Sequence, residues 1–184
     1  MSYVTVNIPV LQTERLILRR FEERDMDAYA AIRGDDAVTG FIGGSMPRYL
    51  VWRSVTSIIG QWAWRGFSFF CVEEKQTGAC IGSVGPYCPD GWPEPEIGWT
   101  LAKAAQGKGY ATEAGRAALG FAYRELGWKT AISVIDPDNH PSQSVARKLG
   151  AAKEQTSAAI WDFTADIWRH QSPEDFFKSN PSLR

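Results

Sequence analysis

The segment from Gln106 to Ala111 has the residue types and the spacing of an anion-binding turn. Glycines at positions 107 and 109 flank Lys108, at the junction of an expected strand and an expected helix. The first turn of a helix has unpaired backbone N–H groups and the positive end of the helix dipole, and glycines let a phosphate approach these donors. We therefore expect this turn to bind an anion, although the same residues are also typical of an ordinary turn.

Two common phosphate-binding motifs are absent from this turn. A nucleoside-triphosphate loop needs Gly, four residues and then Gly-Lys-Ser/Thr, and this order does not occur. A dinucleotide fingerprint needs a third glycine where this chain has Thr112. A nucleotide-dependent oxidoreductase is therefore a less favoured alternative, also because no suitable acid ends the strand that begins at Thr130.

Asn139 and Ser142 form a second polar group further along the chain. Asn139 precedes an expected helix that Pro141 starts and Gly150 ends. An asparagine before a proline is typical of a turn, and a serine here also suits the start of a helix. These two residues become informative only in combination with the glycine turn.

Three separated motifs together resemble the acetyl-CoA-binding core of the GNAT superfamily of N-acetyltransferases. They are Gly98-Trp99-Thr100-Leu101, Gln106-x-x-Gly109-x-Ala111 and Asn139-x-x-Ser142 with the following Lys148-Leu149-Gly150. The opening Thr13-Glu14-Arg15-Leu16-Ile17-Leu18-Arg19, with Glu96-Ile97-Gly98-Trp99 and Ala111-Thr112-Glu113-Ala114, is similar to the RimJ/RimL-type branch, which includes protein N-terminal acetyltransferases.

The resemblance covers residues 11–170 and implies both the fold and the cosubstrate. The implied fold is α/β, a mixed and mostly antiparallel central sheet that is splayed in the middle and flanked by helices on both faces. The implied cosubstrate is acetyl-CoA, without a metal: its pantetheine amides need buried partners and its pyrophosphate needs N–H donors and a cation. The implied cofactor-binding residues are Trp99, Thr100, Leu101, Gln106, Gly107, Lys108, Gly109, Tyr110, Ala111, Asn139 and Ser142.

The implied reaction is direct transfer of an acetyl group from the thioester to a primary amine, either a protein N-terminal α-amine or a small-molecule amine. The chain must then accept a proton, stabilise an oxyanion and protonate the leaving thiolate. Glu96, on the strand beside the expected thioester, is the candidate base, directly or through water. Its alternative role is a surface carboxylate or a hydrogen-bond anchor. A backbone N–H near Trp99 is the candidate oxyanion donor.

The general acid is where this chain departs from the resemblance. Many superfamily members have a tyrosine seven residues after the asparagine, and here that position is Ala146. Ser142 is the candidate substitute, with cofactor ligand or helix-start hydroxyl as its other roles. The departure keeps open a second function, a non-catalytic protein that senses acyl-CoA.

We expect the acceptor to lie against residues 35–49 and 86–95. Carboxylates there attract a cationic amine and aromatic rings pack on its apolar part, unless the acids only keep the loops soluble. The carboxylates are Asp35, Asp36, Glu94 and Glu96, and the rings are Phe41, Trp92 and Trp99.

Histidine, cysteine and metal chemistry are less favoured. His140 stands beside the Asn139 turn and is expected to be exposed, and His170 is expected to be structural. The two histidines and three cysteines make no metal-ligand spacing. Cysteines 71, 80 and 88 are an odd number in a chain of this size, which suits a reducing compartment.

Hydrophobic periodicity predicts the elements that position these residues. Strands are expected over 16–21, 67–73, 79–85, 96–101 and 130–135, and two more in the tail that runs through Trp168. The proline-rich segment 86–95 cannot be a central strand, and the tail from Gln171 is expected to be loosely ordered. Helices are expected from Asp25 to Gly34, from Pro47 to Gly66 with a stripe of Val51, Val55, Ile58, Ile59 and Trp62, from the glycine turn to Leu126 with a stripe of Ala111, Ala114, Ala118, Leu119, Ala122 and Leu126, and from Pro141 to Gly150.

Length and charge limit the remaining choices. A chain of 184 residues predicts a single domain, 1–184. The 20 Lys and Arg residues balance 21 Asp and Glu residues, which argues against nucleic acid or an anionic membrane as a partner. No apolar run predicts a targeting or membrane-spanning segment, so we expect a cytoplasmic protein. We expect it to be a monomer or a homodimer.

Overall fold

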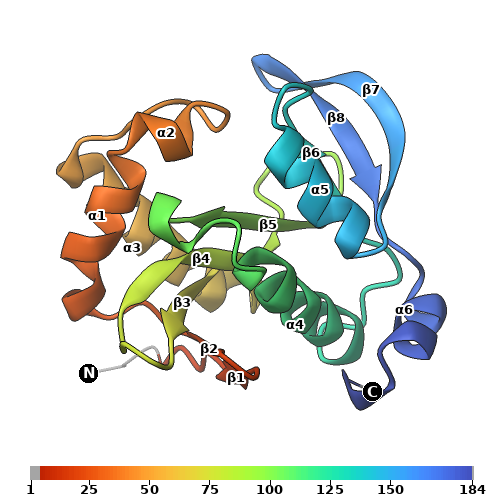
Figure 1. Cartoon of the computed structure of the whole chain (residues 1–184), viewed down its shortest axis with the longest axis horizontal. Helices are drawn as coiled ribbons and strands as arrows, with labels where there is room; N and C mark the ends of the chain where they lie inside the picture. The colour runs from red at the N-terminus through yellow and green to blue at the C-terminus, as the bar shows by residue number, and fades with distance from the viewer. Residues whose placement is uncertain (1–4, 184) are drawn as a thin grey trace.

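The computed structural model describes residues 5–183 and is built on one eight-stranded sheet, in the order β1-β2-β3-β4-β5-β6-β8-β7 (Figure 1). Neighbouring strands are antiparallel except β5 and β6, which are parallel. The predicted mixed, mostly antiparallel sheet is confirmed. The strands are β1 (Leu11–Gln12), β2 (Leu16–Arg19), β3 (Phe70–Glu74), β4 (Cys80–Tyr87), β5 (Glu96–Leu101), β6 (Ile132–Ile135), β7 (Ala152–Ile160) and β8 (Phe163–Arg169).

The helices lie on either side of this sheet's centre. In Figure 1, α1, α2 and α3 lie on one side and α5, β7 and β8 on the other, with β4 and β5 between them. The helix α1 packs on β4, and α4 packs on β4 and β5. The helices are α1 (Met26–Arg33), α2 (Asp36–Thr39), α3 (Arg48–Arg65), α4 (Tyr110–Arg124), α5 (His140–Lys148) and α6 (Pro173–Ser179), with short 3-10 turns at Glu23–Asp25, Lys103–Ala105 and Pro181–Leu183.

The helix α3 shows how the sequence pattern produces these elements. Its predicted stripe is buried except for Ile59, which is only partly buried. The helix ends at Gly66, whose φ of 76° lies in the left-handed region that glycine tolerates best. The helix α4 ends at Arg124, two residues before the predicted end at Leu126; its stripe is buried from Ala114 to Ala122, and Ala111 is partly exposed.

Two sequence predictions are wrong. The strand β4 extends into the proline-rich segment, because Pro86 pairs with Ile97 and Tyr87 pairs with Glu96. A proline is tolerated there because the pairing of β3 with β4 stops at Val84, so no neighbour on that side requires an N–H donor. The tail from Gln171 is not loosely ordered, since α6 buries Phe176 against Tyr123, with ring centroids 5.4 Å apart.

The middle of the sheet is broken, as predicted. The strands β5 and β6 share a single paired position, Glu96 opposite Ile132, whereas β4 and β5 pair over six positions. Beyond that position the two strands diverge, and their facing backbone groups need other partners.

No helix within residues 5–183 is long and apolar enough to cross a membrane.

Candidate active site

A cavity of about 690 Å³ lies at the break in the sheet. Its walls come from α1, the α2–α3 connection, α3, β4, β5, β6, the start of α5 and the β7–β8 turn. Among the predicted site residues, the cavity brings together Glu96, Trp99, Thr100, Asn139 and Ser142.

Side chains replace the backbone hydrogen bond that is lost at the break. In a continued parallel ladder, the next rung would join the Val134 N–H to the Ile97 carbonyl. Here the Val134 N–H donates to Glu96 Oε1 over 3.2 Å, and the Ile97 carbonyl accepts from Ser133 Oγ over 2.7 Å. The break is therefore held open by two specific side chains, and Glu96 is one of them.

Glu96 is buried at the floor of the cavity, with 7% of the residue exposed. Its second oxygen, Oε2, accepts a hydrogen bond from Trp92 Nε1 over 2.7 Å. Burial raises the pKa of Glu96 to about 7, against the hydrogen bonds from Val134 and Trp92, which favour the ionised form. A carboxyl group with a pKa near neutrality is suited to exchange a proton at physiological pH.

The backbone of β5 presents free groups to the break. Residues of an antiparallel strand alternate between facing their partner with both backbone groups and facing away from it. The N–H of Ala102 donates to the Ile81 carbonyl of β4, so the backbone groups of Thr100, two residues earlier, also point toward β4. The backbone groups of Trp99 and Leu101 therefore point the other way, toward β6. The Leu101 carbonyl accepts from Gln106 Nε2 over 3.1 Å. The N–H and carbonyl of Trp99 thus point into the break, and Thr100 lines the cavity.

The start of α5 contributes Asn139 and Ser142. Asn139 is the helix cap: its Oδ1 accepts from Ser142 N–H over 3.1 Å, which leaves its amide NH₂ available. Ser142 Oγ accepts from Trp99 Nε1 over 3.2 Å, so the hydroxyl proton is available for donation. Ala146, at the position where a tyrosine was expected from the resemblance, is fully buried with Ile135.

The glycine turn lies outside the cavity, at the start of α4. Gly107 and Gly109 have φ values of 76° and 83°, and the turn is exposed from Gln106 to Gly109. Ala111 is partly exposed and follows in the first turn of the helix. Tyr110 is buried, and its hydroxyl donates to Glu74 over 2.6 Å, so only its backbone faces the turn.

Arg15 is a basic residue at this turn that the motif did not single out. Its guanidinium pairs with Glu113 at 2.7 Å, donates to the Lys108 carbonyl at 3.0 Å and stacks over the Tyr110 ring at 4.5 Å. The side chain is 42% exposed. Arg15 thus joins β1–β2 to the start of α4 and adds a second cation beside Lys108.

The predicted acceptor residues divide into two groups. Phe41, Trp92 and Glu96 line the cavity, whereas Asp35, Asp36 and Glu94 do not. Asp35 caps α2 through a hydrogen bond from Ala37 N–H, and Glu94 binds Arg169 in an ion pair of 2.6 Å. Trp99 also lines the cavity, but its indole N–H is directed to Ser142.

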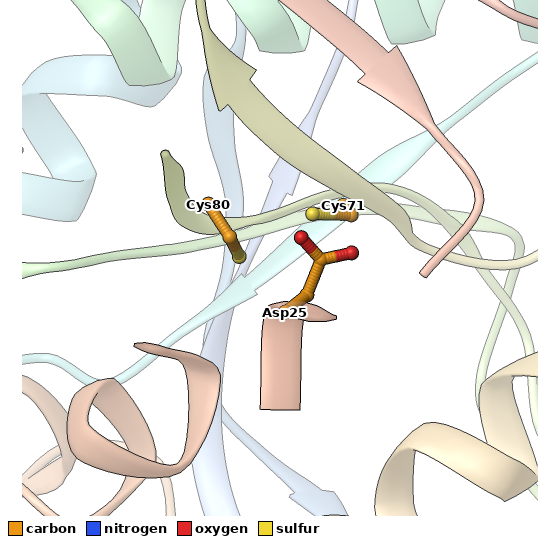
Figure 2. A group of neighbouring side chains, drawn as sticks. All are labelled: Asp25, Cys71 and Cys80. Atoms are coloured by element: carbon orange, nitrogen blue, oxygen red, sulfur yellow. The ribbon is translucent and has the colours of Figure 1, made fainter. Parts of the chain in front are cut away.

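The buried cysteines lie in a cluster apart from this cavity. The side chains of Asp25, Cys71 and Cys80 point toward one another, with their oxygen and sulfur atoms within 4.8 Å (Figure 2). Arg19 already binds both oxygens of Asp25, at 2.7 and 2.8 Å. A hydrogen bond with Cys80 and burial raise the pKa of Cys71, so this thiol stays protonated. The cluster is therefore explained by an ion pair packed against two thiols.

The two histidines have the predicted environments. His140 is exposed. His170 is buried, with Nε2 2.9 Å from Ser133 Oγ, and burial together with the charge of Arg169 lowers its pKa to about 4. His170 is thus neutral at physiological pH and supports the serine that holds the break open.

Sequence reasoning missed how Trp92 and Ser133 act. Ser133 and Val134 stand 36 or more positions after the β5 residues that they contact. Only the pairing of β5 with β6 brings them together, and no local pattern signals it. Trp92 was expected to pack on the acceptor, but its hydrogen bond to Glu96 follows from the path of the β4–β5 connection.

Comparison with known proteins agrees with this geometry. Residues 15–152 match the family model described as the acetyltransferase (GNAT) domain. The "uncharacterized N-acetyltransferase YnaD" of Bacillus subtilis (strain 168) is 28% identical over 144 residues, which cover 78% of this chain and 83% of YnaD. The acetyltransferase from Agrobacterium tumefaciens str. C58 superposes with a TM-score of 0.81 at 29% identity, over 93% of this chain and 99% of that one.

A ribosomal-protein acetyltransferase shares the fold at lower identity. RimL, a ribosomal L7/L12 α-N-protein acetyltransferase solved in complex with coenzyme A, superposes with a TM-score of 0.72 at 16% identity. The superposition covers 88% of this chain and 96% of RimL. With three quarters of its length in the matched domain, this chain belongs to the GNAT acetyltransferase family.

Proposed function

We propose that this protein transfers an acetyl group from acetyl-CoA to a primary amine, with Glu96 as the base. The observation that carries the proposal is the buried Glu96 carboxyl, whose pKa is raised to about 7. It lies in the same cavity as Trp99, whose backbone groups face the break. A proton acceptor and free hydrogen-bonding groups in one cavity are what acyl transfer to an amine requires.

The residues present fit the cosubstrate. A pantetheine arm carries amides that need partners once they are buried, and the Trp99 backbone and the Asn139 amide NH₂ can supply them. The N–H groups at the start of α4, with Lys108 and Arg15, suit a pyrophosphate. Acetyl-CoA, when bound, supplies the acetyl group as a reactive thioester. RimL, which has this fold, binds coenzyme A in its structure.

Glu96 removes the proton that the amine must lose. An α-amino group, with a pKa of about 7.7–8.0, is roughly a tenth neutral at pH 7, whereas a lysine amine, near 10.4, is far less so. Glu96 therefore needs to remove a proton from a smaller fraction of an α-amine than of a lysine amine. Trp92 and Val134 each hold one oxygen of the carboxyl, so Glu96 keeps one orientation toward the cavity.

The oxyanion and the leaving group need one donor each. The Trp99 N–H points into the break and is the oxyanion donor in this proposal. Ser142 relays a proton from water to the thiolate in this proposal: its oxygen accepts from the Trp99 indole, its hydroxyl proton is free to be donated, and water replaces that proton. A thiol with a pKa of about 8.5 is a fair leaving group, so a weak acid is sufficient.

Thermal unfolding with acetyl-CoA, CoA and NADPH in parallel, followed by thiol release with an amine panel, tests the proposal. A ligand at about 100 times its dissociation constant adds roughly 2.7 kcal/mol to stability. We expect stabilisation by both CoA compounds and amine-dependent release of CoA. Stabilisation by NADPH alone would contradict the proposal. Stabilisation by acetyl-CoA without transfer to any amine would favour a non-catalytic acyl-CoA sensor, which the replacement of the expected tyrosine by Ala146 also permits.

A further inference from the structure

The part of the cavity around Glu96 has an aromatic wall. The wall consists of four rings that line the cavity: Phe69, Tyr87, Trp92 and Phe163. Tyr87 lies 5.1 Å from Phe69 and 5.5 Å from Trp92 between ring centroids, and Phe163 lies 6.1 Å from Trp92. Because Trp92 also donates to Glu96, the wall stands directly beside the proposed base.

A fifth ring supports this wall from behind. Trp161 packs on Trp92 with centroids 4.8 Å apart, in the two-residue turn between β7 and β8. Its φ is 50°, a conformation that bulky residues seldom adopt and that glycine or asparagine would accept more easily. The turn thus keeps a tryptophan at a strained position, where its ring supports Trp92.

The rim of the cavity is apolar and exposed on two opposite elements. Phe163 is 42% exposed on the β7–β8 hairpin. Phe41 and Ile42, in the connection between α2 and α3, are 46% and 40% exposed and line the same cavity. Exposed large apolar side chains gathered at the mouth of a cavity indicate that a ligand covers them.

Carboxylates outnumber bases among the charged side chains that line the cavity, which suits an acceptor that carries a positive charge. The acids that line it are Glu96, Asp136 and Asp162, and Arg33 lines it as a base. None of the ion pairs among residues 5–183 includes Arg33, whose Nη2 contacts Met46 Sδ at 3.3 Å. Arg33 repels an ammonium group placed beside it, so the acceptor's charge belongs on the Glu96 side of the cavity.

We infer that the acceptor is an amine whose nitrogen-bearing carbon chain carries an aromatic ring. The ring packs between the aromatic wall and Phe41, and the ammonium is held over ring faces until Glu96 accepts its proton. Arylalkylamines and peptides with an aromatic first residue both have this chemistry. The inference rests on the proposed acetyl transfer and specifies the substrate class of the same cavity.

Steady-state kinetics with a matched acceptor panel tests the inference. The panel contains 2-phenylethylamine, butylamine, spermidine, and two tetrapeptides that differ only in phenylalanine or serine at the first position. We expect kcat/KM to be at least about tenfold higher for each aromatic acceptor than for its matched partner, which corresponds to about 1.4 kcal/mol; spermidine, which has no ring, should also be used at least about tenfold less well than 2-phenylethylamine. The two aromatic arms separate a small amine from a peptide N-terminus.

Three variants assign the preference to the named side chains. Phe163→Ala and Phe41→Ala should raise the KM for aromatic acceptors about tenfold, and the KM for butylamine by less, because its short chain contacts the rings less. Trp64→Ala removes an aromatic side chain that is 91% exposed and does not line the cavity, so it should change nothing.

The outcomes separate this inference from the proposed function. Equal or better use of serine peptide, butylamine or spermidine overturns the aromatic preference and leaves acetyl transfer intact. Loss of activity toward all acceptors alike in Phe163→Ala or Phe41→Ala also overturns it. No transfer to any acceptor, with acetyl-CoA bound, overturns the proposed function and the inference with it.

Discussion

Glu96 combines two roles at the residue scale. It is one of the two side chains that replace the lost β5–β6 rung, and it is the proposed base. Burial contributes to both roles. It excludes water from the hydrogen bond between Val134 N–H and Glu96, and it raises the pKa of the carboxyl to about 7. A base of this kind acts only when it is ionised, so its titration should be visible in the rate.

We predict that kcat at a saturating acceptor rises with pH up to an apparent pKa near 7 and is flat above it. Glu96→Gln keeps the shape of the side chain but cannot accept a proton, so kcat should fall by about 10²–10⁴ and this limb should disappear. Initial rates of CoA release between pH 5.5 and 9 check this. An unchanged limb in Glu96→Gln would show that another group titrates.

Trp92→Phe provides a graded comparison. The phenylalanine keeps a ring in place but removes the N–H that stabilises the Glu96 carboxylate. The pKa of Glu96 should therefore rise, and the limb should move to higher pH with kcat recovered at pH 9. Loss of activity that pH does not restore would instead indicate a structural defect.

At the element scale, the site is a consequence of two strands that pair at one position and then part. Ser133 keeps the Ile97 carbonyl satisfied at the point of divergence, and His170 supports Ser133 from β8's end. A side chain here therefore determines whether the sheet opens.

Ser133→Ala should weaken acetyl-CoA binding and destabilise the fold. The Ile97 carbonyl loses its donor, which lowers the free energy of unfolding by about 1–3 kcal/mol. If the Val134 N–H moves to this carbonyl instead, the break between β5 and β6 becomes narrower. Ser133→Thr keeps the hydroxyl and is the matched control. Calorimetric titration with acetyl-CoA and urea unfolding measure both effects, and wild-type values for Ser133→Ala would refute the role given to this hydroxyl.

Phe176 anchors the helix α6 to the rest of the fold. Phe176→Ala should lower the free energy of unfolding by about 3–5 kcal/mol, because Phe176 is 2% exposed and fills the space beside Tyr123. Phe177→Ala, at the partly buried neighbour, should cost less. Urea unfolding compares them. A cost for Phe176→Ala no larger than for Phe177→Ala would mean that α6 is only loosely attached.

The sequence predicted elements better than their contacts. The strand β5 has the bounds that were expected, and α3 ends where Gly66 permits a left-handed residue. Such features depend on nearby residues. The Ser133–Ile97 contact and the packing of α6 depend on residues that are distant in the sequence. The inclusion of Pro86 in β4 likewise could not be predicted, because it depends on the β3–β4 pairing stopping at Val84. The residues of the glycine turn were located, but their roles as ligands remain predictions.

At the scale of the whole molecule, two buried groups act on stability in opposite directions. The pKa of Glu96 is raised to about 7, so this group makes the fold less stable as pH rises from about 4.5 to 7. The pKa of His170 is lowered to about 4, so that group makes the fold less stable as pH falls from about 6.5 to 4. Between pH 4.5 and 6.5 the two contributions oppose each other.

A variant that removes one of the two groups should leave the pH dependence of stability that the other group contributes. Relative to wild type, Glu96→Gln should become more stable as pH rises from 4.5 to 7, by about 3 kcal/mol in total. His170→Gln should lose the destabilisation that accompanies acidification from pH 6.5 to 4. Urea unfolding across pH 4–8 measures both. Parallel curves for wild type and Glu96→Gln would mean that Glu96 has an ordinary pKa in the folded protein.

The most direct measurement of the central claim is mass spectrometry of a primary amine incubated with acetyl-CoA and either the wild-type protein or Glu96→Gln at pH 8. We predict that the wild type adds one acetyl group to the amine nitrogen and releases CoA in equal amount. Glu96→Gln should bind acetyl-CoA but form product at a rate lower by about 10² or more. Equal rates for the two proteins would contradict the role of Glu96, and an amine left unmodified by both would contradict acetyl transfer itself.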